Sequence, residues 1–324
     1  MNDSTVIIVG NTISALMSAC RLADLGQHAT LISPRPIINA ITQIDLEPMN
    51  MAENADLAKE LTQLTLKQGG YLGAQSFADE MWKQSFGLID LLDKIGVPWK
   101  RSLEGRLIAH KQSGDQAFSY YAEGGTRTQI HRALVSQVYK YSDQSLIKLC
   151  EHHEPLSLIV DTDQRCHGIV FQDRVNMTID AIPAEAVVVA TNGYERLFTA
   201  NEVSKYPDDF AWLIDQGIFL ANAECLEPAH SLGGLWINEK QMTNIKGCFA
   251  IGACVGMYHG KASILGNAIL ADVFAGHSVA EPILDYVKEG HASSESSLYE
   301  SCITDEVQKF DELLDLSGPE DLHV

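Results

Sequence analysis

Apolar and polar positions along the first 33 residues predict a β-strand, a helix and a second β-strand in succession. The apolar run Val6–Val9 has the character of a buried strand, and it stops at Gly10. Apolar residues then recur at helical spacing over residues 13–25, Gly26 follows as a helix-ending residue, and Ala29–Ser33 is again strand-like. This order predicts a βαβ unit whose first turn leads directly into a helix N-terminus.

The middle of the chain predicts helices followed by a small antiparallel layer. Residues 53–68 and 75–95 have the spacing of two amphipathic helices, and an extended segment begins at Val97. A further helix is predicted over about 127–139, directly after the pair Gly124 and Gly125. Short strand-like runs at 156–160, 168–172 and 176–179 predict a meander.

Two later runs are too apolar to face water. Residues 186–193 and 247–252 therefore predict parallel strands that are buried on both faces, and a helix is predicted over 265–285. From Glu289 the chain is polar, with a linker at 291–297 before a short acidic helix. The fold class predicted from this order is α/β, with a Rossmann-like central parallel sheet and a small antiparallel β layer.

Composition narrows the function classes. The 324 residues are 46% hydrophobic and 20% charged, which indicates a globular chain, and the formal net charge of -20 disfavours nucleic-acid and anionic-lipid partners. No apolar run reaches the roughly 18 residues that would span a bilayer, and no leader pattern is recognised, so we expect a cytoplasmic chain without membrane insertion. The seven cysteines are odd in number and lack C-x-x-C pairs, so neither a disulfide framework nor a metal site is expected.

The turn after the first strand is the main candidate for ligand chemistry. In this position a helix N-terminus commonly holds a dinucleotide pyrophosphate, and the contacts expected here come from Gly10, Thr12, Ile13, Ser14 and Ala15. The G-x-G-x-x-G fingerprint is altered, because Thr12 and Ala15 replace two glycines. Ser33 stands where an acidic residue usually holds the ribose. The alternative is an ordinary turn in a fold that has lost its ligand.

Several motifs, taken in order, resemble one flavoprotein family. They are G-Y-L-G-A-Q-S-F-A-D at 70–79, the segments 92–98 and 104–106, A-T-N-G at 190–193, P-A-H-S-L-G-G at 228–234, and the strand, loop and helix of 252–270. Their order resembles the flavoprotein subunit of the succinate dehydrogenase and fumarate reductase family, with its L-aspartate oxidase and ketosteroid dehydrogenase relatives. The likeness extends from residue 4 to about 285 and implies a Rossmann-like FAD-binding fold.

The resemblance also implies roles for individual residues. His230, His259 and Lys261 are the candidate catalytic residues, although a lone histidine such as His230 is more often structural. The N–H groups of the helix that opens at Gly266 would stabilise negative charge at the flavin N1 and C2 carbonyl, unless this is a plain helix start. The further residues expected to contact FAD are Thr126, Arg127, Ala190, Thr191, Gly193, Gly252, Ala253, Asn267 and Ala268.

Departures from the family pattern are equally informative. The resemblance implies that the capping domain of the family is missing near 227–230 and that its C-terminal helical domain is missing too, so we expect an FAD-binding domain at 1–288 and a linker with an acidic helix at 289–324. Ser263 stands at the position of the substrate-clamping arginine, and Ala253 at that of the acid that holds the ribityl chain. Ile41 aligns with the histidine that binds flavin covalently, so non-covalent FAD is expected.

Two hypotheses of different class follow. The first is an FAD-dependent oxidoreductase whose small-molecule substrate is unknown and is not succinate or fumarate, with a protein partner or a second copy covering the open flavin face in a homo- or hetero-oligomer. The second is a non-catalytic subunit that retains the scaffold for assembly or regulation of a partner complex.

Overall fold

A parallel sheet forms the centre of the computed structural model, which describes residues 6–39, 47–111, 117–192, 213, 216–221, 234–290 and 296–315. Within these ranges the sheet has five strands in the order β13-β10-β1-β2-β6, all paired in parallel. The strands are β1 (Val6–Val9), β2 (Ala29–Ser33), β6 (Ile147–Glu151), β10 (Ala186–Val189) and β13 (Cys248–Ala250). Every residue of β1 and β10 is buried, which confirms the prediction of central parallel strands.

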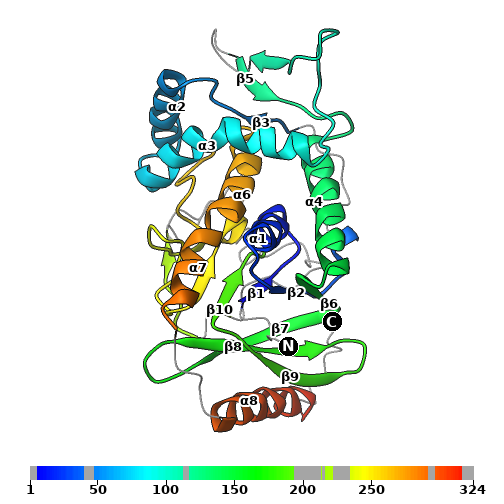
Figure 1. Cartoon of the computed structure of the whole chain (residues 1–324). Coiled ribbons are helices and arrows are strands. Elements are labelled where there is room, and N and C mark those ends of the chain that lie inside the picture. The colour runs from blue at the N-terminus through cyan, green and yellow to red at the C-terminus, as the bar shows by residue number, and fades with distance from the viewer. Residues whose placement is uncertain are drawn as a thin grey trace.

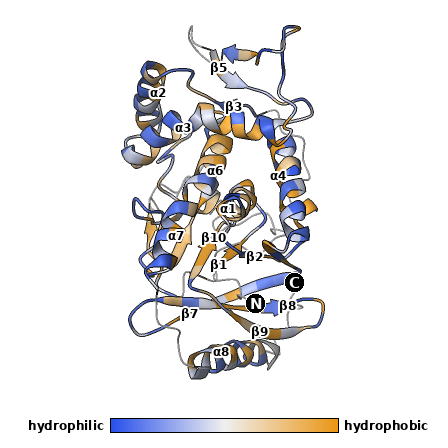
Figure 2. Ribbon diagram, in the orientation of Figure 1, coloured by the Kyte–Doolittle hydropathy of each residue, from blue (hydrophilic) through white to orange (hydrophobic). Residues whose placement is uncertain are grey.

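Helices cover one face of this sheet (Figure 1). They are α1 (Ile13–Asp24), α4 (Thr126–Asp143), α6 (Asn267–Ser278) and α7 (Ala280–Lys288). The single helix expected at 265–285 is in fact two helices, α6 and α7, which meet at Val279. Pro282 explains the break, because its ring has no N–H and would clash with the carbonyl of Ser278 in a continuous helix. Figure 2 shows the apolar residues gathered on α1, α6 and the central strands.

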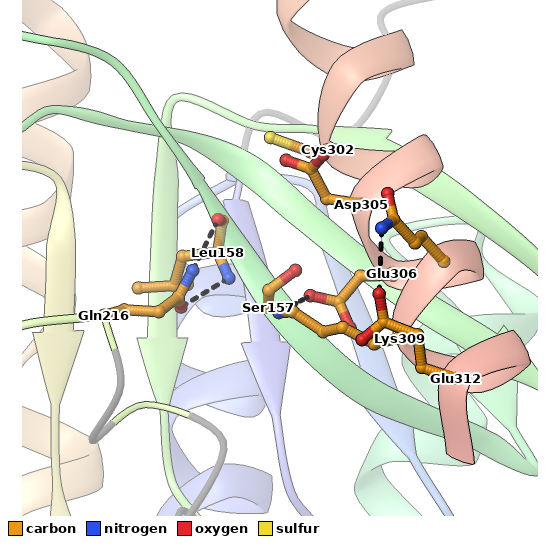
Figure 3. Close-up of a pocket in the computed structure, with 9 residues that line it drawn as sticks. Ser157, Leu158, Gln216, Cys302, Asp305, Glu306, Lys309 and Glu312 are labelled. Carbon is orange, nitrogen blue, oxygen red and sulfur yellow. Dashed lines mark hydrogen bonds and ion pairs between the residues drawn. The ribbon is translucent and has the colours of Figure 1, made fainter. Parts of the chain in front are cut away.

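The other face carries the expected antiparallel layer. It consists of β7 (His153–Val160), β8 (Cys166–Asp173) and β9 (Thr178–Pro183). On its far side lies α8 (Ser296–Asp315), a helix of 20 residues and so longer than the short one expected. A cavity of about 360 Å³ is lined by residues of β7 and α8 and by Gln216, and Figure 3 shows its mostly polar lining, which includes Ser157 and Glu312.

A smaller layer sits beyond the N-terminal end of α6. The expected helices are present as α2 (Ala55–Gln68) and α3 (Gln75–Lys94). Beside them is a three-stranded antiparallel sheet that was not predicted, formed by β3 (Met49–Asn50), β4 (Ala109–Lys111) and β5 (Ala117–Tyr120). The remaining short elements are η1 (Ile37–Asn39), β11 (Leu220–Ala221), β12 (Gly234–Leu235) and η3 (Gly252–Cys254). Among the described helices, none has the length and apolarity to cross a membrane.

Two glycines allow the elements around the first turn to approach closely. Gly10 has a φ of 130°, and a Cβ added there would lie 2.3 Å from the carbonyl oxygen of Ala190 at the end of β10. A Cβ added to Gly276 would lie 2.5 Å from the Ser14 carbonyl oxygen, so α6 crosses α1 in backbone contact. The first turn of α1 is thereby packed against the end of β10 on one side and against the C-terminal part of α6 on the other.

Candidate functional site

The N-terminus of α1 is held by its own capping residue, Thr12. The Thr12 Oγ1 atom accepts a hydrogen bond from the Ala15 N–H at 3.2 Å and donates one to the Ala190 carbonyl at 2.7 Å. It also lies 2.9 Å from the Ser14 Oγ atom. The residue that replaces a fingerprint glycine thus ties the start of α1 to the end of β10.

Two donors of this helix end remain open. The Ala15 and Leu16 N–H groups both bond to Thr12, through its side chain and its carbonyl. The N–H groups of Ile13 and Ser14 precede the first intrahelical bond, and no acceptor for them is found among the described residues, although both residues are buried. Such donors at the positive end of a helix dipole suit a phosphate group.

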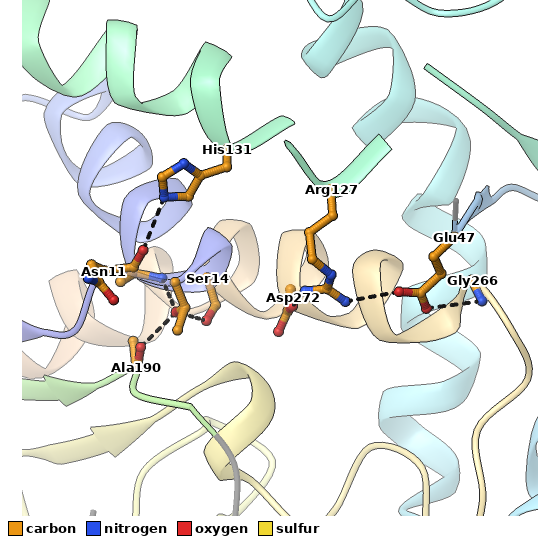
Figure 4. Close-up of polar contacts among 10 residues, drawn as sticks. Asn11, Ser14, Glu47, Arg127, His131, Ala190, Gly266 and Asp272 are labelled. Carbon is orange, nitrogen blue, oxygen red and sulfur yellow. Dashed lines mark hydrogen bonds and ion pairs between the residues drawn. The ribbon is translucent and has the colours of Figure 1, made fainter. Parts of the chain in front are cut away.

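His131, which was not among the predicted site residues, supports the same turn. Figure 4 shows the His131 ring directed at Asn11. The His131 Nε2 atom lies 3.3 Å from the Asn11 carbonyl oxygen, and His131 is 2% exposed. Burial lowers the pKa of His131 to about 4, so at neutral pH the ring is uncharged and its N–H donates to Asn11. His131 lies on the buried face of α4 with Thr128 and Leu134, and that spacing could have revealed it.

Buried His131 and partly buried His259 should make the free energy of unfolding depend on pH. The folded-state pKa values of His131 and His259 are both about 4, below the ordinary value of 6.5, so between these pH values the unfolded chain binds more protons. We expect the contribution of each to be present above pH 6.5 and to fall by about 1–2 kcal/mol at pH 5. Urea unfolding of His131→Gln at pH 7 and pH 5 should show a weaker pH dependence than wild type. An unchanged dependence would contradict this.

The N-terminus of α6 is built into a buried polar network. The Asn50 Nδ2 atom donates to the Asn267 Oδ1 atom and to the Leu265 carbonyl, both at 2.8 Å. The Asn267 Nδ2 atom in turn donates to Thr65 Oγ1 at 3.3 Å. The Asn267 side chain is fully buried and serves to anchor α6 to β3 and α2. Ala268 follows it in the first turn of α6.

Arg127 lies between two carboxylates at this end of the site. Its Nη1 atom is 2.9 Å from Asp272 Oδ2 and its Nη2 atom is 3.2 Å from Glu47 Oε2 (Figure 4). Burial lowers the pKa of the Arg127 guanidinium, but the two carboxylates raise it by more, so the group stays charged. Burial raises the pKa of Asp272, and Arg127 offsets part of that rise.

Glu47 also reaches the helix end itself. Its Oε1 atom accepts a hydrogen bond from the Gly266 N–H at 3.3 Å, and its side chain is 16% exposed. The carboxylate therefore occupies the position where the sequence predicted that α6 would meet the flavin. Neither Glu47 nor Asp272 was among the predicted site residues, and both reach Arg127 from distant parts of the chain.

Residues from β10 and η3 meet the start of α1. A Cβ on Gly252 would lie 2.1 Å from Ser14 Oγ, so η3 packs directly against α1. Thr191 is buried at the end of β10, whereas Ala253 is exposed. These positions put Ala190, Thr191, Gly252 and Ala253 around the predicted turn. Gly193 and Ile41 lie outside the described residues.

Two predicted contacts are engaged in local turns. The Ser33 Oγ atom donates to the Arg35 carbonyl at 2.6 Å, and Ser33 is fully buried. Thr126 is 1% exposed, and its Oγ1 atom accepts from the Ala122 N–H at 3.2 Å. Their roles as cofactor contacts stay predictions.

Two of the three candidate catalytic residues, His259 and Lys261, lie on a separate loop. His230 lies outside the described residues. The loop that carries His259 and Lys261 contacts the end of α2, where the Lys261 N–H donates a hydrogen bond to the Gly69 carbonyl at 2.8 Å. Burial lowers the pKa of His259 to about 4, and its Nδ1 atom has no hydrogen-bond partner among the described residues. The Lys261 residue is exposed.

The two ends of the candidate site therefore differ in how they fit a dinucleotide. The α1 end offers open N–H donors that suit a pyrophosphate. The α6 end is filled by the Glu47 carboxylate, which has to leave before another group can meet Gly266. The α1 end is therefore compatible with a pyrophosphate as it stands, and the α6 end is compatible with a further group only after Glu47 moves.

Comparison with known proteins identifies the domain. The model of a family described as "FAD binding domain" matches residues 5–213, well over half of the chain. The matched range contains β1, α1, β2 and β10, and so includes the turn at Gly10.

Individual relatives agree with this match. The succinate dehydrogenase flavoprotein subunit of Bacillus subtilis is 23% identical over 450 aligned positions, which cover 100% of this chain and 77% of that protein. Several further curated relatives match over 23–38% of their own length. An E. coli quinol fumarate reductase structure has a TM-score of 0.79 at 16% identity, covering 98% of this chain and 76% of that one.

A ketosteroid dehydrogenase is also similar in structure. A 3-ketosteroid dehydrogenase from Rhodococcus jostii has a TM-score of 0.62 at 12% identity, with 85% of this chain and 96% of that chain covered. Identities this low show a shared fold. They confirm the predicted architecture, a central parallel sheet with helices and small antiparallel sheets.

Proposed function

This chain belongs to the FAD-binding-domain family, with FAD as its cofactor, and on that basis we propose that it is an oxidoreductase that holds FAD non-covalently between α1 and α6. The observation that carries the proposal is that the N–H groups of the buried residues Ile13 and Ser14 have no acceptor among the residues that the structure describes. They lie in the family-matched range, at the carboxyl end of the central strands, where α/β sheets bind nucleotides.

Each end of the site has its own task in this proposal. Residues 10–15 bind the pyrophosphate, and His131 fixes the Asn11 carbonyl so that this turn keeps its shape. The network of Asn50, Asn267 and Thr65 orients the N-terminus of α6 toward the flavin. Bound FAD supplies the capacity to accept or donate a hydride.

The substrate proposed is a small molecule other than succinate or fumarate. A dicarboxylate clamp needs free guanidinium groups, but the Nη atoms of Arg127 are paired with Asp272 and Glu47, and Ser263 stands at the clamp position. His259, uncharged at neutral pH, and the exposed Lys261 are the candidates for handling a substrate proton. His230 stays a third candidate from sequence.

A partner chain or a second copy is proposed to cover the flavin face. The alignment with the Bacillus subtilis relative is 450 positions long, whereas this chain has 324 residues. The alignment therefore contains long gaps in this chain, which fits the loss of an internal capping domain. Apolar side chains near Lys261 are exposed, with Tyr71 at 74% and Leu265 at 61%. Covering them would exclude water from the reaction. Relatives named as subunits support an assembly of this kind.

A non-catalytic role remains the second candidate, and one observation favours it. Glu47 fills the α6 end with a carboxylate of the chain's own, as expected of a scaffold that no longer needs its ligand. The two candidates differ in FAD binding, since a purely structural subunit would not gain stability from added FAD.

A charge placed at the first turn should separate FAD binding from folding. Asn11→Asp adds a carboxylate beside the N-terminus of α1, which favours the helix dipole but repels a pyrophosphate. We expect the Kd for FAD to rise about tenfold or more, with a Tm equal to or slightly above that of wild type. Flavin fluorescence titration and thermal unfolding measure the two effects.

The matched control is Asn54→Asp. Asn54 caps α2 by accepting the Leu57 N–H at 2.9 Å, so the substitution makes the same chemical change at a helix N-terminus remote from the proposed pyrophosphate. FAD affinity should not change in this variant. If both substitutions weaken FAD binding equally, the α1 end does not hold the pyrophosphate.

A further inference from the structure

The Glu47 carboxylate makes two contacts that a bound ligand at the α6 end would contest. It accepts from the Gly266 N–H at 3.3 Å through Oε1 and pairs with Arg127 Nη2 at 3.2 Å through Oε2. The side chain is 16% exposed, so these contacts are made away from bulk water, where charge-assisted bonds are stronger. Figure 4 shows Glu47 between Arg127 and Gly266.

We propose that Glu47 is an internal competitor for the flavin end of the site. In the FAD-free chain its carboxylate satisfies Gly266 and Arg127, and it withdraws when the isoalloxazine ring binds at α6. This inference rests on the proposed function. It deepens that function by assigning the control of FAD affinity to one residue of the chain.

The contacts around Glu47 allow its side chain to be replaced by a bound ligand without disrupting its neighbours. When Glu47 leaves, the Arg127 guanidinium keeps its ion pair with Asp272, in which the two atoms lie 2.9 Å apart. Asn50, Asn267 and Thr65 hold the α6 terminus independently of Glu47, and a Cβ on Gly266 would lie 2.7 Å from Asn50 Oδ1. The end of α6 is therefore preformed, and the Glu47 side chain is the part that has to move.

The competitor model predicts a gain of affinity on removing a carboxylate. A ligand that binds only the open conformation has an apparent Kd equal to its intrinsic Kd divided by the fraction of chains in that conformation. Glu47→Ala should therefore lower the Kd for FAD about five- to tenfold, and Glu47→Gln, which keeps the shape but loses the ion pair, should give an intermediate gain. The Tm of the FAD-free Glu47→Ala variant should fall.

Titration with ADP tests the α1 end of the site separately from the α6 end. ADP carries the adenosine and phosphates but no isoalloxazine, so it meets the α1 end and does not reach Glu47. Calorimetric titration of wild type, Glu47→Ala and Glu47→Gln with FAD and with ADP should show the gain for FAD alone. Glu53→Ala is the charge-matched control, since Glu53 lies on the same segment but accepts its hydrogen bond from the Tyr120 hydroxyl at 2.7 Å.

The outcomes of these titrations distinguish failure of the competitor assignment from failure of the proposed function. Wild type that binds FAD, with Glu47→Ala binding it equally or more weakly, overturns the competitor assignment and leaves the proposed function intact. Equal gains for FAD and ADP also overturn it, because Glu47 would then act on the whole domain. Absence of FAD binding in wild type and in all variants overturns the proposed function together with this inference.

Discussion

Replacing Gly10 by alanine is expected to lower the free energy of unfolding by about 3–5 kcal/mol. The new Cβ would lie 2.3 Å from the Ala190 carbonyl oxygen and 2.8 Å from its carbon, and both are backbone atoms that cannot rotate away. The φ of 130° adds backbone strain for any residue with a side chain. Either β1 or β10 has to shift, although their pairing forms the middle of the central sheet. Urea unfolding at pH 7 measures the loss.

Gly26→Ala is the control for backbone strain alone. Gly26 also has a positive φ, 77°, but nothing lies within 4 Å of an added Cβ. We expect a loss of about 1–2 kcal/mol there, from strain without a clash. If Gly10→Ala costs no more than Gly26→Ala, the close approach of the first turn to β10 is wrong.

Replacing Arg127 by methionine should be nearly as costly, because it leaves the carboxylates of Asp272 and Glu47 without their cation. Breaking a buried ion pair from one side typically costs about 3–5 kcal/mol, and we expect a loss near the lower figure because Arg127 is partly exposed. Arg174→Met is the matched control, since its contact with Glu154 at 3.2 Å is on the surface. That control should change stability by about 0–1 kcal/mol.

The loss in Arg127→Met should also depend on pH. Burial raises the pKa of Asp272 above its ordinary value, and removing Arg127 raises it further. A raised folded-state pKa means that the native chain binds more protons, so stability is lost as the pH rises through that pKa. The difference between Arg127→Met and wild type should therefore be larger at pH 8 than at pH 5. A difference independent of pH would show that Asp272 is not the group left unpaired.

The sequence predicted the elements whose apolar pattern is long or continuous. Strands β1, β2, β10 and β13 and helices α1, α2 and α3 were found because burial on both strand faces, or on one helix face, leaves a plain periodicity. Strand β6 was missed because its pattern mixes buried and exposed residues at the sheet edge. Strands β3, β4 and β5 are two to four residues long, too short for a period to register.

The part of the site that is local in the sequence could be predicted, whereas the contacts between distant residues could not. The turn at Gly10 is local, so its residues could be found from one strand-to-helix pattern. The contacts of Arg127 with Glu47 and Asp272 join residues 80 and 145 positions apart, and His131 reaches Asn11 across 120 positions. No single-sequence pattern encodes such pairings, because they arise from how the folded helices cross.

The most direct test of FAD binding at the N-terminus of α1 is a titration of the purified wild-type chain with FAD, followed by flavin fluorescence and by thermal unfolding, with Asn11→Asp measured alongside. We expect saturation at one FAD per chain, a Tm that rises with FAD concentration, and weaker binding in the variant. A wild-type chain that binds no FAD at saturating concentration, with an unchanged Tm, would contradict this expectation.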